Sequence, residues 1–150
     1  MIRVQTEDFS LQKEYDRLRQ LSSVGAVVTF TGLVRDINQG EQVSSLTLEH
    51  YPGMTEKALS EIVSQARQRW DIQQCTLIHR VGELKLSDQI VFVGIACMHR
   101  QEAFAACEFI MDYLKTQAPF WKKESNSQGE SYWVDARESD TTALDKWSGK

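Results

Sequence analysis

The apolar run IVFVGIACM (90–98) constrains the fold of this chain more than any other segment. It extends over nine residues without a polar or charged side chain. A membrane helix needs about 18 or more apolar residues, so this run is too short to span a bilayer. We interpret it as a β-strand, and its unbroken apolar pattern predicts that both of its faces are covered by other parts of the chain.

Three helices are expected around this strand. Ser10 and Thr55 are predicted to cap the first two helices at their N-termini. The third helix should end near Ala118, because Pro119 follows and a residue before proline avoids the helical conformation. The apolar stripes expected on the three helices are Leu11, Tyr15, Leu18 and Leu21; Leu59, Ile62, Val63, Ala66 and Trp70; and Phe104, Cys107, Met111 and Leu114.

Strands are predicted at 24–35, 46–49 and 75–84, and the polar segment 36–42 is expected to be a loop. Two further segments, 120–124 and 131–137, flank a turn-rich stretch and are predicted to form a hairpin. The resulting order is α, β, β, α, β, β, α and then the hairpin. Because helices and strands are mixed without regular βαβ repetition, the sequence predicts an α+β fold.

Length and charge exclude several classes of protein. The 150 residues suit a single domain, 1–150, with a polar tail from about Glu138 that we expect to become ordered against a partner. Trp147, in this tail, has no evident packing partner in the sequence. The net charge of −4 argues against nucleic-acid binding. The N-terminus has no apolar core of signal-peptide type, so we expect a cytoplasmic protein that does not enter a membrane.

The three cysteines are not expected to bind metal or to carry sulfur. Cys75, Cys97 and Cys107 are odd in number and form no CxxC motif, which argues against a disulfide framework or a thiolate metal site. Cys97 lies in the apolar run and Cys107 on an apolar helix face, so both are predicted to be buried. The histidines also lack the spacing of a zinc helix, and we therefore predict no metal site.

His99 and Arg100 form the first candidate site. They directly follow the apolar run, at the predicted start of the third helix. A helix N-terminus offers unpaired backbone N–H groups and a partial positive charge, so two basic side chains there would create an anion site. The competing interpretation is structural, because basic residues beside strand ends are common on protein surfaces.

The segment KTQAPFWKKE (115–124) is the second candidate. Lys115 falls in the last helical turn, Pro119 forces a turn, and the aromatic residues Phe120 and Trp121 are expected to exclude water beside Lys122. Apolar surroundings lower the pKa of a lysine and make it a usable base or nucleophile. The alternative is a helix-capping lysine followed by a solvated hairpin lysine.

The chain resembles the molybdopterin synthase large-subunit family over most of its length. The matching blocks are VVTFTGLVR (27–35), LTLEHYPGMTEKAL (46–59), HRVGEL (79–84), VFVG with HR (91–100), FIMDYLKTQAPFWKKE (109–124) and ARESD (136–140). The resemblance implies a single domain of α/β-hammerhead type with an additional small antiparallel β-hairpin region. It also implies a sulfurtransferase of molybdenum-cofactor biosynthesis that uses no cofactor of its own.

The same resemblance implies specific partners. The large subunit would form a homodimer at the centre of a heterotetramer, with a small ubiquitin-like subunit at each end. The C-terminal Gly-Gly of that sulfur-carrier subunit would bear a thiocarboxylate. The sulfur acceptor would be cyclic pyranopterin monophosphate (precursor Z), and two sulfur atoms would create the dithiolene of molybdopterin.

Six residues acquire expected roles from the matching blocks. Lys115 and Lys122 would form the catalytic pair. The residues expected to bind substrate are Arg35, His99, Arg100 and Lys123. Leu33 departs from the family pattern, which has lysine in the GxVR segment, and it would contribute only shape.

Two other classes of function compete with the enzyme. A non-catalytic scaffold for a ubiquitin-like partner would be indicated by loss of Lys115 or Lys122, but both are present. A stand-alone pterin-binding or regulatory protein would not need a deep channel for a peptide tail.

Overall fold

The computed structural model describes residues 1–38, 41–126, 128–134 and 143–148 of the chain. Its helices are α1 (Leu11–Leu18), α2 (Met54–Arg69), α3 (Arg100–Gln117) and the short 3-10 helix η1 (Leu144–Trp147). Its strands are β1 (Ile2–Gln5), β2 (Ala26–Leu33), β3 (Ile37–Asn38), β4 (Glu41–Gln42), β5 (Ser45–His50), β6 (Ile72–Arg80), β7 (Gly82–Lys85), β8 (Gln89–Cys97), β9 (Phe120–Ser125) and β10 (Ser131–Val134). The α+β prediction is confirmed.

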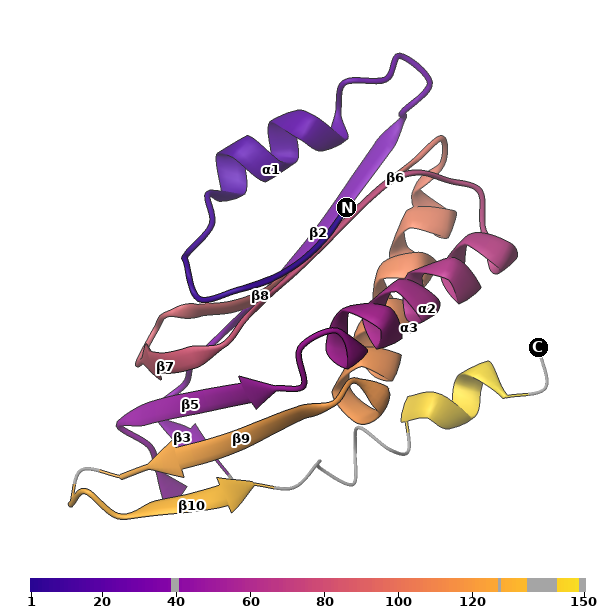
Figure 1. Ribbon diagram of the computed structural model, residues 1–150. Helices are drawn as coiled ribbons and strands as arrows, with labels where there is room; N and C mark the ends of the chain where they lie inside the picture. The colour runs from indigo at the N-terminus through magenta and orange to yellow at the C-terminus, as the bar shows by residue number, and fades with distance from the viewer. Residues whose placement is uncertain (39–40, 127, 135–142, 149–150) are drawn as a thin grey trace.

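Two four-stranded sheets organise these elements. The first has the order β1-β6-β8-β2 and the second has the order β10-β9-β5-β7, while β3 and β4 form a separate pair. All strand pairs are antiparallel except β1 with β6. Figure 1 shows α1 on one face of the first sheet and α2 and α3 on the other, with the second sheet to one side. The chain is therefore layered around β6 and β8.

The apolar run occupies the centre of the first sheet, as predicted. All residues from Val91 to Cys97 are buried in β8. One face of this strand contributes Val93 and Ile95 to the core beneath α2 and α3. The opposite face contributes Phe92 and Ala96 to a smaller core that includes Leu18 of α1. Both faces are covered, which explains why the run contains no polar residue.

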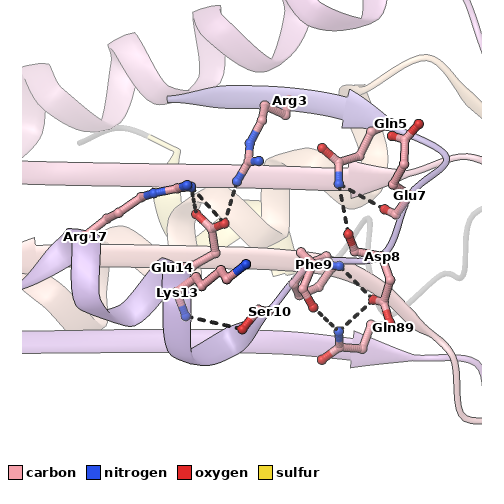
Figure 2. A network of polar contacts seen from close by, with 10 residues as sticks. All are labelled: Arg3, Gln5, Glu7, Asp8, Phe9, Ser10, Lys13, Glu14, Arg17 and Gln89. Atoms are coloured by element: carbon pink, nitrogen blue, oxygen red, sulfur yellow. Dashed lines mark hydrogen bonds and ion pairs between the residues drawn. The ribbon is translucent and has the colours of Figure 1, made fainter.

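A polar network holds α1 against the first sheet (Figure 2). Ser10 caps the helix, as predicted, by accepting a hydrogen bond from the Lys13 backbone N–H at 3.3 Å. Glu14 is only 3% exposed, and its carboxylate accepts hydrogen bonds from Arg3 at 2.7 Å and Arg17 at 3.0 Å. Two guanidinium groups thus compensate the buried carboxylate. The expected apolar stripe is wrong, because Leu11, Tyr15 and Leu21 are exposed and only Leu18 is buried.

The predicted strand 75–84 is two strands in two different sheets. Gly82 has a φ of +91°, a conformation that side chains other than glycine rarely adopt, and it lies where β6 of the first sheet gives way to β7 of the second. The short strand β1 was missed, and the predicted loop 36–42 contains β3 and β4.

The helix predictions need two corrections. Gly53, not Thr55, is the N-cap of α2, and Thr55 is buried within the first turn. Helix α3 ends at Gln117, with Ala118 as its C-cap, as Pro119 predicts, but Phe104 is 60% exposed rather than part of the apolar stripe.

The described part of the C-terminal tail packs on the helices of the chain itself. The Trp147 ring lies 5.7 Å from Trp70 and 5.3 Å from Phe109, and its indole N–H donates to Asp112 at 2.7 Å. Lys146 also forms an ion pair with Glu108. Residues 135–142 and 149–150 of the predicted hairpin and tail lie outside the described part. No helix in the described ranges is long and apolar enough to cross a membrane.

Candidate active site

The C-terminal end of α3 leads directly into β9 and brings two candidate lysines to one region. Lys115 lies in the last turn of α3, and Lys122 is the third residue of β9. In the pairing of β9 with β5, Phe120 lies opposite His50 and Lys122 lies opposite Leu48. Directly opposed residues of antiparallel strands share a face of the sheet. Since Leu48 is 1% exposed, Lys122 projects from the inner face of the second sheet, where it is half-buried.

A buried histidine lies at the same place. His79, near the end of β6, is 5% exposed, and its ring stacks on Phe120 at 3.8 Å between centroids and 18° between planes. Burial is the main cause that lowers the pKa of His79 to about 3; the positive charges of Lys115 and Lys122 and the His50 ring act in the same direction, while a hydrogen bond to the Arg80 carbonyl opposes the shift. We refer to Lys115, Lys122, His50, His79 and Phe120 as the lysine cluster.

One side-chain hydrogen bond fixes the turn between the two lysines. The Thr55 hydroxyl donates to the Pro119 carbonyl at 3.1 Å and accepts from the Tyr51 backbone N–H at 3.0 Å. The start of α2 is therefore joined to the α3–β9 turn. Sequence reasoning assigned Thr55 only a capping role and gave His79 no role. The long-range contacts of these residues leave no signal in local spacing.

The inner and outer faces of β9 separate residues that the sequence placed together. Side chains alternate along a strand, so Trp121 and Lys123 project from the face opposite to Lys122. Trp121 is exposed beside Tyr51, with ring centroids 6.2 Å apart, and Lys123 lies over the Trp133 ring at 5.9 Å. Of the two aromatic residues expected to shield Lys122, only Phe120 shares its face. The side chains of Lys122 and Lys123 project from opposite faces of the sheet.

The other basic pair lies at the opposite end of α3. His99 is the N-cap of this helix and Arg100 is its first residue, and both are exposed. They line an open pocket of about 420 Å³, which we call the α3 N-terminal pocket; its lining residues are Gly25, Ala26, Met98, His99, Arg100 and Gln101. At 1.5 Å per helical residue, Arg100 and Lys115 lie about 22 Å apart along the helix. A single copy of the chain does not bring the two candidate groups together.

Arg35 belongs to the end of the molecule that holds the lysines. Strand β2 pairs with β8 so that Ala26 lies opposite Cys97 and Leu33 lies opposite Gln89. Helix α3 starts where β8 ends and returns across the sheet, so the C-terminal end of β2 points the same way as the C-terminal end of α3 (Figure 1). Arg35, two residues beyond β2, is exposed, and so is Leu33.

The cysteines offer no reactive thiolate. Cys97 and Cys107 are buried, as predicted, and Cys75 is buried as well; all three are free cysteines. Burial raises the pKa of Cys75 and Cys97 to about 11 and that of Cys107 to about 12. These thiols stay protonated at neutral pH, so none has the thiolate character that a sulfur carrier requires. In the described ranges, no cluster of three or more histidine, cysteine or acidic side chains could hold a metal ion.

Comparison with known proteins defines the family. Residues 4–117 match the MoaE protein family. The chain belongs to the MoaE family. The molybdopterin synthase catalytic subunit of Vibrio cholerae is 57% identical to it over 146 residues, which cover 97% of each chain. The comparisons place the chain among the catalytic subunits of molybdopterin synthase, enzymes of sulfur transfer, which confirms the family resemblance.

Solved structures agree with this assignment. The molybdopterin biosynthesis MoaE protein from Burkholderia ambifaria superimposes with a TM-score of 0.85 at 50% identity, covering 100% of this chain and 99% of that one. A complex of subunits 1 and 2 of molybdopterin-converting factor from Helicobacter pylori gives a TM-score of 0.72 at 17% identity, covering 91% and 90% of the two chains. This second likeness concerns the fold alone.

Proposed function

We propose that the lysine cluster is the catalytic centre of a molybdopterin synthase. In this reaction, sulfur passes from a C-terminal thiocarboxylate on a small ubiquitin-like subunit to cyclic pyranopterin monophosphate. The observation that carries the proposal is that the end of α3 with Lys115 and the start of β9 with Lys122 meet at a buried histidine: Lys122 shares the inner face of β9 with Phe120, and the Phe120 ring is stacked on His79. Two ammonium groups at one place suit a reaction whose sulfur donor is an anion and in which negative charge develops on carbonyl and pterin oxygens.

The two lysines differ in their surroundings. Lys115 is exposed at the end of a helix, where the partial negative charge of the helix terminus favours its ammonium form. Lys122 is half-buried on the inner face of the second sheet, which it shares with Phe120. We assign both lysines to charge stabilisation, with one of them also transferring protons.

The phosphate-binding part of the site comes from the α3 N-terminal pocket. His99 and Arg100 present cationic side chains beside the free backbone N–H groups of a helix N-terminus, a setting that suits a phosphate. Arg35 and Lys123 would contribute further positive charge. Because about 22 Å of helix separates Arg100 from Lys115, we assign the two parts of one site to two copies of the chain.

A pair of copies could bring these parts together through β2. This strand is the last one in the order β1-β6-β8-β2, so within the described residues it has a paired strand on one side only. Phe30 and Leu33 of this strand are exposed. Two β2 strands paired antiparallel about a twofold axis would place the His99 end of one copy beside the Arg35 and Lys115 end of the other.

The small subunit supplies the sulfur. Its C-terminal Gly-Gly tail would enter between α3 and β9, since glycine has no side chain to obstruct a narrow approach. The H. pylori structure, a complex of two subunits, supports such a partner. We further propose that residues 1–150 act as a single domain in the cytoplasm, where unpaired cysteines such as these are usual.

Reconstitution tests the proposed function. The purified chain, the thiocarboxylated small subunit and the cyclic precursor are combined, and dithiolene product is measured. We expect product with the native chain and none when the small subunit lacks its last two glycines. Lys57→Ala removes an exposed lysine on α2 and serves as the matched control for the Lys115→Ala and Lys122→Ala variants in this assay. A non-catalytic scaffold would bind the small subunit and yield no product.

A further inference from the structure

The contact between His79 and Phe120 joins the two sheets. His79 lies on β6 of the first sheet, and its ring is stacked on Phe120 of β9 in the second. Its Nδ1 lies 2.9 Å from the Arg80 carbonyl oxygen. A carbonyl oxygen only accepts hydrogen bonds, so Nδ1 carries the proton and the ring is fixed in orientation.

The His79 ring is uncharged at neutral pH. Burial is the main reason for its low pKa, and Lys115 from α3, Lys122 from β9 and His50 from β5 act in the same direction. Arg80, the next residue along β6, directs its guanidinium elsewhere, to the carbonyls of Thr6 and Gln89. The His79 ring therefore adds no further positive charge to a region that already contains two lysines.

The stack acts on the segment that carries Lys122. Phe120 and Lys122 are two residues apart on β9 and share its inner face. Any movement of Phe120 away from the His79 ring would therefore displace the backbone from which Lys122 projects. The Thr55–Pro119 hydrogen bond restrains the same segment one residue earlier.

We propose that His79 is a positioning residue for Lys122: by stacking on Phe120 it holds the first residues of β9 and so keeps the Lys122 side chain in its place on the inner face of the second sheet. The inference rests on the catalytic role proposed for the two lysines. Displacement of a reacting group by about 1 Å can lower a rate about 100-fold, so a contact that fixes a lysine backbone can affect turnover without touching substrate.

The test compares three variants of the complete enzyme with its small subunit. His79→Ala removes the stack and should lower kcat about tenfold or more, while KM for the precursor stays within about twofold. His79→Phe restores an aromatic ring and should recover at least about half of the lost kcat. Ile78→Val is the matched control, because Ile78 is equally buried on β6 but faces the α1 side of the sheet; its kcat should be unchanged.

A second measurement reports on Lys122 without turnover. Lysines are labelled by reductive ¹³C-methylation, and the Lys122 signal is assigned by its absence in Lys122→Arg. In His79→Ala the signal should move toward that of the exposed Lys57, whereas in His79→Phe and Ile78→Val it should stay in place. Should the alanine variant fail to fold, His79→Leu fills the volume without an aromatic ring and is held to the same criteria.

The outcomes separate this inference from the proposed function. If Lys115→Ala and Lys122→Ala turn over normally in the same assay, the catalytic assignment is wrong and the positioning role falls with it. If both lysine variants are inactive but His79→Ala has normal kcat and an unmoved Lys122 signal, only the positioning role is overturned.

Discussion

The two ends of α3 both carry basic residues, but they are built differently. At the C-terminal end, His79 and Phe120 are stacked, Lys122 shares the inner face of β9 with Phe120, and a Thr55 hydrogen bond fixes the turn between α3 and β9. At the N-terminal end, His99 and Arg100 are exposed around an open pocket. The first end thus holds its side chains within the chain, with the exception of the exposed Lys115, whereas the second leaves both basic side chains accessible. This difference is expected if the first end performs the chemistry and the second binds the substrate for the active site of another copy.

The largest effect should come from the lysines. Lys115→Ala should lower kcat by about 100-fold or more, because it removes a cation from the place where negative charge develops. The melting temperature should change little, since Lys115 is an exposed residue at a helix end. Lys122→Ala should be comparably severe. Steady-state kinetics and thermal unfolding of the same preparations check both statements. Near-normal turnover by Lys115→Ala would show that the C-terminal end of α3 does not perform the chemistry.

Arg100→Ala should affect binding more than chemistry. Loss of a charge-assisted hydrogen bond to phosphate costs about 1.5–3 kcal/mol, which corresponds to a precursor affinity about 10- to 100-fold weaker. Arg100→Lys should restore little of it, because lysine lacks the two-pronged geometry of a guanidinium. Calorimetry with the precursor measures the effect. Unchanged affinity in the alanine variant would mean that the open end of α3 does not bind substrate.

Thr55→Val tests whether the hydrogen bond from α2 holds the α3–β9 turn in place. The change leaves the Pro119 carbonyl and the Tyr51 N–H without this partner, so it should cost about 1–3 kcal/mol of stability. A several-fold decrease in kcat should accompany the loss. Thr76→Val is the control, since Thr76 is buried on β6 but lies on the α1 side of the sheet. Chemical denaturation and kinetics of both variants would show whether the activity loss is specific to Thr55.

The smallest effect is expected from the cysteines. With all three pKa values raised to about 11 or 12, the thiols are not nucleophiles at neutral pH. A variant with Cys75, Cys97 and Cys107 all replaced by alanine should be less stable, because small cavities remain, but should form product at nearly the native rate. A folded yet inactive variant would show that sulfur passes through this chain.

Local sequence signals predicted a large part of this architecture. The apolar run gave the covered central strand, Ser10 gave the start of α1, and Pro119 gave the end of α3. The missed features depend on distant partners. Strand β1 is short and exists because it pairs with β6. The break between β6 and β7 at Gly82 becomes evident only in the structure, where the two strands belong to different sheets.

The candidate site was predictable in its residue types but not in its arrangement. Spacing identified Lys115, Lys122, His99 and Arg100, because each lies beside a helix end or a proline turn. Spacing could not show that α3 holds the two pairs apart. It also could not show that the alternation of β9 separates Lys122 from Lys123, or that His79 of β6 meets Phe120. These relations arise from how strands pair across the molecule.

The central claim is that one active site combines Lys115 of one copy with Arg100 of another. Mixed dimers measure this directly: Lys115→Ala and Arg100→Ala chains carry different affinity tags, are expressed together, and the doubly tagged dimer is isolated. With precursor held below the native KM, each parent homodimer should be nearly inactive. If the site is shared, the mixed dimer retains one intact site of two and should show about half of the native activity. A mixed dimer as inactive as its parents would contradict the account.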